Sequence, residues 1–253
     1  MAIISSLALS DLVILFAFWL LLIATVCLPQ GWQRLVNKPL SDWLLDLCGL
    51  TIQGILIPSL QVGLLYQGLH RLLPQLANCV DLPSAVEFLI CFVLIDYAYY
   101  WNHRWLHSHA WTWHRVHHTV TQLDVLGSSR NSLWSSFLIL YLWLHTLMLY
   151  LLKEPSGYLW GISLTAILDL WRHSQLGPAP HSRLYRLLSP WLVLPQDHAL
   201  HHSRGHRYNF GANLKLWDSL HGTYLRSPHF SHPLGIKTAL TFWQKLLYPF
   251  SLK

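Results

Sequence analysis

Five long apolar stretches constrain this chain most, because each is long enough to cross a bilayer. A spanning helix needs roughly 20 mostly apolar residues, and a backbone inside lipid must satisfy its own hydrogen bonds. The mean hydropathy is +0.33 and only 11% of the residues are charged, which sets the chain apart from soluble globular domains. We therefore expect an all-α integral membrane protein with four to five spanning helices. The stretches are residues 7–28, 43–66, 83–101, 133–152 and 156–172.

The first two stretches carry further signals. Residues 7–28 lack the positively charged start and the small-residue cleavage site of a signal peptide, so we expect a retained span. Residues 43–66 contain Pro58 and three glycines, which predicts either a kinked helix or a re-entrant pair.

Four cysteines lie far apart in apolar stretches. They form neither a Cys-x-x-Cys pair nor the disulfide framework of a small secreted protein. We therefore expect reduced thiols in the core at Cys27, Cys48, Cys79 and Cys91.

The basic residues predict an orientation. If the segment after the third stretch is cytosolic, all Lys and Arg except Arg71 and Lys153 lie on the cytosolic side, as the positive-inside rule requires. The net charge is +6, but the basic residues are dispersed beside apolar stretches, so anionic lipid head groups are better partners than nucleic acid. We expect a bacterial inner membrane or the endoplasmic reticulum as the location.

Eight histidines stand in three tight clusters, and each cluster contains a pair spaced i, i+4. A helix places such a pair one turn apart on one face, and neutral imidazole is the commonest nitrogen ligand of iron, zinc and copper. The clusters therefore predict an oxygen-handling metal site at the cytosolic membrane surface. They are His103 and His107; His114, His117 and His118; and His198, His201 and His202.

Three further polar residues near the apolar stretches need separate interpretation. Asp169 and His173 lie one helical turn apart, so Asp169 is a possible ligand, although pairing with Arg172 or with an imidazole is the simpler interpretation. We expect His145 to bond a neighbouring helix as a neutral imidazole, and the role of His221 stays open.

Polar and turn-forming residues surround the clusters. The second N–H of a ligand histidine usually has an acceptor that fixes the ring. Two turn-rich segments, residues 209–211 and 217–223, are expected to close a cap over the site. The candidate acceptors are Asp96, Asn102, Asp124 and Asp197.

The order of these histidine motifs resembles the fatty acid hydroxylase/sterol desaturase superfamily. The similarity covers about residues 85–226, so we expect N-terminal spans in 1–82, a catalytic domain in 83–226 and a cytosolic tail in 227–253. The motifs are Asp96-x3-Tyr100-Trp-x-His103-Arg-x2-His107, His114-Arg-Val-His-His118, His173-Ser-Gln, His198-x2-His-His202 and Trp217-Asp-x3-Gly-Thr223.

The resemblance implies a membrane oxidoreductase with a di-iron site, O2 as co-substrate and an external electron donor. It implies hydroxylation or desaturation of a long-chain lipid, such as a sterol or a fatty acyl chain, with no catalytic residue beyond the metal ligands. By motif, the ligands are His103, His107, His114, His117, His118, His173, His198, His201 and His202.

Two departures from the family pattern stand out. Asp169 occupies a position where some members have histidine. Arg130 fits an Arg-x-His-Pro type sequence after the second cluster, but Ser132 and Leu133 do not. These differences predict a divergent substrate pocket or a distinct subfamily.

Two other function classes stay open, a membrane zinc hydrolase and a non-enzymatic protein that binds or transports metal or haem. Nine histidines exceed the three protein ligands usual at catalytic zinc, and no His-Glu-x-x-His sequence is present. Transport would favour ligands inside the bilayer. The chain contains neither a dinucleotide fingerprint nor a cysteine set for an iron–sulfur cluster, so an oxidoreductase would need a carrier such as a ferredoxin or a cytochrome.

Overall fold

The computed structural model describes residues 2–203, 207–226, 229–230 and 233–250, and side chains from Leu9 onward. Every regular element within these residues is a helix. Two isolated bridges, Val80 with Leu152 and Leu192 with Leu214, are the strand-like pairings among them. The all-α prediction is confirmed.

Three helical runs are long and apolar enough to cross a membrane. Between 11% and 28% of the residues in their apolar windows are buried inside the protein, so most of their side chains face outward. A surface of this kind is stable against lipid and not against water. The three runs are α1 (Ala2–Val26), residues Leu40–Leu72 and residues Ser84–Ser108.

The run Leu40–Leu72 is continuous, so the re-entrant alternative is wrong. Two of its turns are π-helical, and Pro58 follows the first of them. Proline lacks the N–H that an α-helix needs at this position, and a wider turn is a common accommodation. The run consists of α3 (Leu40–Thr51), η1 (Ile52–Leu56), α4 (Ile57–Leu60), η2 (Gln61–Tyr66) and α5 (Gln67–Leu72).

The fourth and fifth apolar stretches form shorter helices than expected. Residues 133–139 form turns and one short 3-10 helix, so α9 covers only Leu140–Leu151, and α10 covers Ser156–Arg172. At 1.5 Å per residue they rise about 18 and about 26 Å, less than the roughly 30 Å of a hydrocarbon core. Three helical runs are thus long enough to cross a membrane, and the count of four to five crossings stays a prediction.

The remaining helices are short, and they include those that carry the second and third histidine clusters. The third long run consists of α6 (Ser84–Leu89), η4 (Ile90–Ile95) and α7 (Asp96–Ser108). The others are α2 (Gly31–Val36), η3 (Pro74–Leu76), α8 (Trp111–His114), η5 (His117–Thr119), η6 (Val125–Ser129), η7 (Ser135–Phe137), α11 (Arg183–Leu188), α12 (Pro195–Ser203), α13 (Leu216–Leu220) and α14 (Phe242–Leu247).

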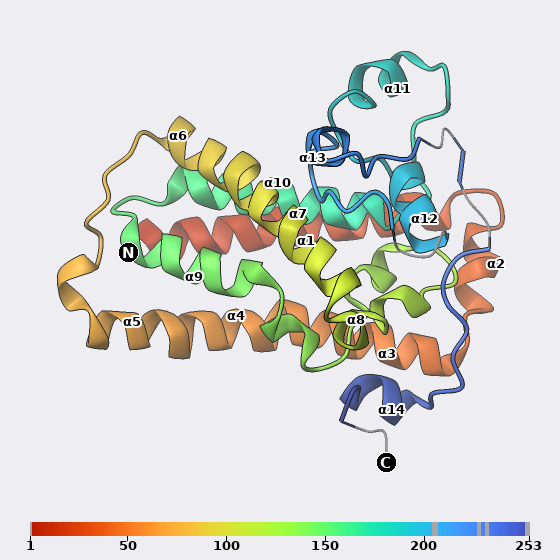
Figure 1. Cartoon of the computed structure of the whole chain (residues 1–253), viewed down its shortest axis with the longest axis horizontal. Helices are drawn as coiled ribbons and strands as arrows, with labels where there is room; N and C mark the ends of the chain where they lie inside the picture. Colours follow the sequence, from red (N-terminus) through yellow and green to blue (C-terminus); the bar gives the residue numbers. More distant parts are fainter. Residues whose placement is uncertain (1, 204–206, 227–228, 231–232, 251–253) are drawn as a thin grey trace.

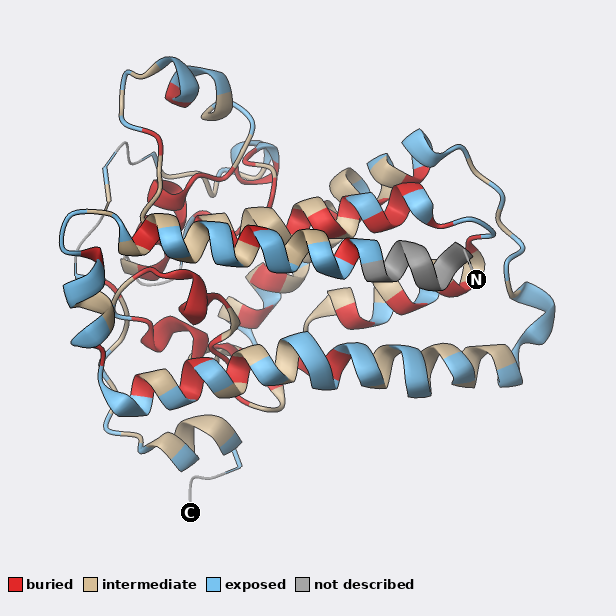
Figure 2. Cartoon of the chain, turned by 180° about the vertical axis from the view of Figure 1, so that it is seen from behind, coloured by how far each residue is buried: buried red, intermediate tan, exposed pale blue. Residues whose placement is uncertain are grey.

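The long helices lie side by side, and most short elements gather at one end of them (Figure 1). α10 packs against both α1 and α6. We call the gathered part, residues 109–139 and 173–250, the cap. Buried residues concentrate there, whereas the outer faces of the long helices are exposed (Figure 2). α5, which carries Arg71, lies at the opposite end.

A buried ion network joins α3 to the cap. The Arg130 guanidinium donates to Asp46 through Nε at 2.5 Å and to Asp42 through Nη1 at 3.0 Å. Lys38 pairs with Asp46 and also with Asp124, at 2.9 Å. Breaking one partner of a buried pair is costly because it leaves a charge without compensation. The network therefore fixes α3 on the segment that follows the second histidine cluster.

The cysteines are free, as expected, but only one of them is a core thiol. Cys91 is buried and Cys48 is half-buried, whereas Cys27 and Cys79 are exposed. The prediction of four core thiols is wrong for the two exposed ones, because Cys27 lies in the turn after α1 and Cys79 in the connection between the second and third long runs.

Candidate metal centre

The end of α7 and the start of the cap bring three imidazoles together. His103 and His107 lie one turn apart on α7, and their Nε2 atoms are 3.1 Å apart. The Nε2 atom of His114, at the end of α8, lies 3.1 Å from that of His103. His118 and His201 complete this first histidine group, in which one nitrogen from each ring lies within 4.8 Å of the others.

A second histidine group forms beside the first. It contains His117 from η5, His173 at the end of α10, and His198 and His202 from α12. The Nε2 atom of His198 is 3.0 Å from that of His173 and 3.1 Å from that of His202. The rings of His118 and His202 stack at 4.5 Å, so the two groups are neighbours.

The spacing of the ring nitrogens fits two metal ions. Nitrogens that bind one ion at about 2.1 Å and at right angles lie about 3.0 Å apart, close to the 3.0–3.1 Å seen in both groups. All nine predicted histidines belong to one group or the other, and all but the half-buried His107 are buried.

Burial favours the neutral form of several of these rings. It lowers the pKa of His117 to about 3, with a further lowering by the neighbouring His173. It also lowers the pKa of His198 and of His202 well below the ordinary value. A neutral imidazole retains the lone pair that binds a metal ion.

Backbone carbonyls orient four of the rings. In each case the Nδ1 of the ring faces a carbonyl oxygen, so Nδ1–H donates and Nε2 is left as the acceptor that faces the group. The pairs are His103 with Phe210 at 2.8 Å, His117 with Arg130 at 3.2 Å, His173 with Asp169 at 2.9 Å and His201 with Tyr208 at 2.8 Å.

Comparison with known proteins shows which family the chain belongs to. The family model described as fatty acid hydroxylase matches residues 88–223, more than half of the chain. The chain belongs to the fatty acid hydroxylase family. No solved structure is significantly similar to this family member.

Three of its curated relatives come from a bacterium, an animal and a plant. An ornithine lipid hydroxylase, OlsE, of Rhizobium tropici is 31% identical over 68% of the chain and 52% of its own length. An alkylglycerol monooxygenase of Danio rerio is 28% identical over 68% of the chain and 39% of its own length. A methylsterol monooxygenase 1-3 of Arabidopsis thaliana is 25% identical over 68% and 57%. The chain thus spans about half the length of these relatives.

The four predicted acceptors bind groups other than imidazoles in the part of the chain that the structure describes, which corrects the sequence analysis. Asp96 accepts from the backbone N–H of Asn213 and Leu214 and from the Trp217 indole, at 2.8 to 3.1 Å. Asn102 instead bonds the backbone of Leu138 and Leu140, at the start of α9.

The other two carboxylates also bind elsewhere. Asp124 accepts from Lys38 and caps η6 through the N–H of Leu126. Asp197 pairs with Lys215 at 2.7 Å and accepts from the N–H of Leu194. These carboxylates hold the backbone around the histidines. The ring N–H groups of four histidines donate to backbone carbonyls instead.

Asp218 is a supporting residue whose role the sequence analysis missed. Its carboxylate accepts from the backbone N–H of Phe210 at 2.8 Å, from that of Gly211 at 2.7 Å and from the Thr223 hydroxyl at 2.7 Å. The Phe210 carbonyl then accepts from His103. The motif Trp217-Asp-x3-Gly-Thr223 was the sequence signal that could have identified Asp218. This residue organises the loop that orients the His103 ring of the first histidine group.

The three open polar residues lie outside both histidine groups. Asp169 is half-exposed and pairs with Arg172 at 2.8 Å, as the simpler interpretation predicted. His145 bonds the Tyr158 hydroxyl on α10 at 2.8 Å, which confirms its expected contact with a neighbouring helix. His221 lies 3.2 Å from the Tyr97 hydroxyl.

The segment that departs from the Arg-x-His-Pro pattern packs on the C-terminal part of the cap. The Ser132 hydroxyl bonds that of Ser135 at 2.7 Å, and the N–H of Leu133 donates to the Leu246 carbonyl at 2.8 Å. Arg130, which does fit the pattern, belongs to the buried ion network.

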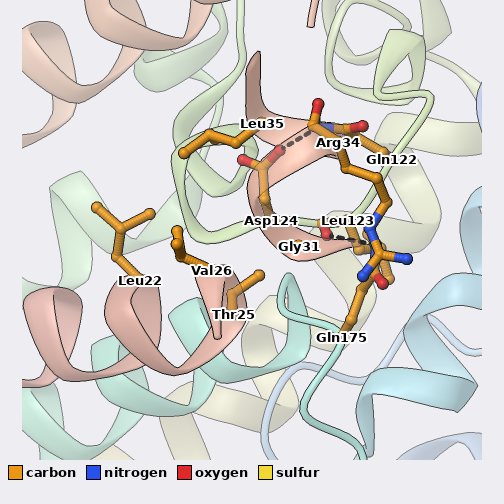
Figure 3. Close-up of a pocket in the computed structure, with 10 residues that line it drawn as sticks. All are labelled: Leu22, Thr25, Val26, Gly31, Arg34, Leu35, Gln122, Leu123, Asp124 and Gln175. Atoms are coloured by element: carbon orange, nitrogen blue, oxygen red, sulfur yellow. Dashed lines mark hydrogen bonds between the residues drawn. The ribbon is translucent and has the colours of Figure 1, made fainter. Parts of the chain in front are cut away.

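The pocket drawn in Figure 3 lies apart from the histidines. It forms where the end of α1 meets α2 and the segment before η6, with Leu22 and Val26 on one side and Arg34, Asp124 and Gln175 on the other. None of its lining residues belongs to a histidine group. We therefore assign it no part in the metal centre.

Proposed function

We propose that the chain is a membrane oxidoreductase that uses O2 and two iron ions to hydroxylate a long-chain lipid. The observation that carries this proposal is the pair of adjacent groups of imidazoles, all but one of them buried, at the end of a membrane-spanning helix. The ions would be held by His103, His107, His114, His118 and His201 in one group and by His117, His173, His198 and His202 in the other.

The names of the relatives support the same chemistry. Each of the three is named for oxidation of a lipid, whether an ornithine lipid, an alkylglycerol or a methylsterol. Hydroxylation replaces a C–H bond with C–OH, and the second oxygen atom of O2 leaves as water with two electrons and two protons from outside. Iron bound by the two histidine groups would supply the site at which O2 is reduced.

The chain's own residues provide position and shelter. The carbonyls of Phe210 and Tyr208 hold two rings so that Nε2 faces the first histidine group. Burial limits the access of water to both groups, which favours controlled reaction with the lipid over side reactions. The catalytic domain is proposed to occupy residues 83–226, on the cytosolic face, with electrons supplied by a ferredoxin or a cytochrome.

The proposal is tested by lipid mass spectrometry under isotopically heavy O2. A host with the gene should contain a lipid that carries one heavy oxygen atom, and this lipid should be missing with His201→Ala. The matched control is His109→Ala, because His109 is an exposed cap histidine outside both groups. It should leave the product unchanged.

Other outcomes would change the assignment. A gene-dependent lipid that has lost two hydrogens without gaining oxygen would mean desaturation. Equal product from wild type and His201→Ala would refute the site. Zinc in place of iron in the purified protein, with no oxidised lipid, would favour the hydrolase or the metal-binding alternative.

A further inference from the structure

α11 carries an exposed apolar face that the metal centre does not explain. The helix projects sideways from the bundle near α13 (Figure 1). Tyr185 points inward and is 7% exposed, whereas Leu184 and Leu187 are 52% and 67% exposed, and Trp191, in the turn after α11, is 66% exposed. A contiguous outward apolar face of this kind on a folded protein marks a contact with a partner or a membrane.

This face continues onto the neighbouring helix α13. The N–H of Lys215 donates to the Trp191 carbonyl at 2.9 Å, which joins the two segments. α13 then exposes Leu216 by 45% and Leu220 by 64%. We call Leu184, Leu187, Trp191, Leu216 and Leu220 the lateral face.

Contacts with α7 set the depth of the lateral face in the membrane. α7 ends the third long run, and Trp101 on it is 44% exposed, as expected of an interfacial aromatic residue. The ring of His221, which follows α13, lies 4.8 Å from the Trp101 ring. The Trp217 ring of α13 lies 4.6 Å from the Tyr97 ring. α13 and the joined α11 therefore lie beside the interfacial part of the span.

The charges around the lateral face select an anionic surface. Arg183 and Arg186 are exposed on α11, on either side of Leu184. Arginine at the edge of a helix with exposed leucine and tryptophan is typical of helices that lie in the membrane interface. Each basic residue near an anionic leaflet adds to the attraction.

We propose that the lateral face inserts into the head-group layer of anionic phospholipids, on the side of the membrane that holds the histidines. α11 lies between His173 and His198 in sequence, so this insertion tethers to the bilayer the segment that connects two members of the second histidine group. The proposal requires a membrane-spanning chain but neither metal nor lipid oxidation.

The test is photolabelling of the full wild-type chain in vesicles of phosphatidylcholine with phosphatidylglycerol. A phospholipid with a photoreactive group near its ester bonds serves as the probe, and labelled peptides are identified by mass spectrometry. Labelling of α11 should approach that of α1, the internal standard. Residues 235–239, in the chain that leads to α14 and away from the lateral face, should stay almost unlabelled.

Two variants separate insertion from simple proximity. Arg183→Glu with Arg186→Glu should lower the α11-to-α1 ratio at least about twofold, because each basic residue contributes a factor of about five to attraction by an anionic surface. Lys237→Glu, a charge reversal at an exposed position outside the lateral face, is the control and should not change the ratio. Absent α11 labelling in wild type would overturn the proposal. So would α11 labelling that is abolished by an added acidic electron carrier, since the face would then be a protein-docking surface.

Discussion

Asp218 illustrates how a single carboxylate supports the candidate site without touching it. Its side chain is 1% exposed and binds two backbone N–H groups of the loop that contains Phe210. Burial raises the pKa of Asp218 to about 6 from its ordinary 3.8, and its hydrogen bonds only partly oppose this rise. The folded chain therefore binds this proton more tightly than the unfolded chain.

The sign of the pH effect follows from that shift. The contribution of Asp218 to the free energy of unfolding is fully present below about pH 3.8 and is lost as the pH rises through about 6. Asp218→Asn should destabilise the protein by about 1–3 kcal/mol near neutral pH. The NH2 group of the asparagine would face a buried backbone N–H and leave it without an acceptor. As the pH falls from about 7 to about 5, the difference in free energy of unfolding between the wild type and Asp218→Asn should grow by about 1 kcal/mol. Only the wild type has a carboxyl at this position that gains a proton and stabilises the fold.

Thermal unfolding of both proteins in one detergent, at several pH values across this window, measures the effect. A constant difference between them would show that the carboxyl does not titrate there. The same melts on Asp81→Asn, an exposed surface carboxylate, provide the control, and this variant should follow the wild type.

The nine candidate ligand histidines could be expected as a set from the sequence, whereas the orientation of their rings could not. Spacing of i, i+4 places two rings on one helical face. This spacing predicted the pairs His103 with His107 and His198 with His202. The acceptors are main-chain carbonyls, and a carbonyl has no signature in residue type. Phe210 lies 107 residues from His103 in the chain, so only the folded loop reveals the contact.

At the scale of elements, α3 packs unusually close to the cap. A Cβ at Gly49 would overlap the carbonyl oxygen of Ser129, which precedes Arg130 of the ion network. Gly49→Ala should therefore destabilise the protein by about 1–3 kcal/mol, the usual cost of overpacking. Thermal unfolding in detergent measures it.

Gly54 provides a matched control in the same long helix. Among the residues that the structure describes, nothing lies within 4 Å of a Cβ at this position. Gly54→Ala should leave stability unchanged or raise it by up to about 1 kcal/mol, because alanine favours the helix. Equal effects of the two substitutions would mean that α3 and the cap are not in the close contact described.

Element boundaries were predictable only where lipid dictates them. The first three stretches form long helices because hydrophobic length alone decides that outcome. The fourth stretch was mispredicted at residues 133–139, which are mostly apolar but form turns and a short 3-10 helix. Their backbone bonds Asn102 and the Leu246 carbonyl of α14. Tertiary partners decided that segment, and its composition carried no sign of them.

At the scale of the whole molecule, the long helices and the cap have different roles. The helices present apolar side chains outward, and the cap buries polar and charged residues around two histidine groups. The division matches the sequence, in which charge and histidine were concentrated after the third stretch. The adjacency of the two groups needed four separate cap and helix segments, so no local pattern could predict which histidines share a group.

Iron content of the purified, detergent-solubilised chain tests the central claim most directly. Elemental analysis should find two iron ions per chain, one for each histidine group. His202→Ala should lose one of them, and His109→Ala should retain both. Chelation should lower the melting temperature of the wild type, because an ion that binds only the folded chain stabilises it. A chain that carries a single zinc ion, or two iron ions that persist when His202 is replaced, would contradict the two-group centre.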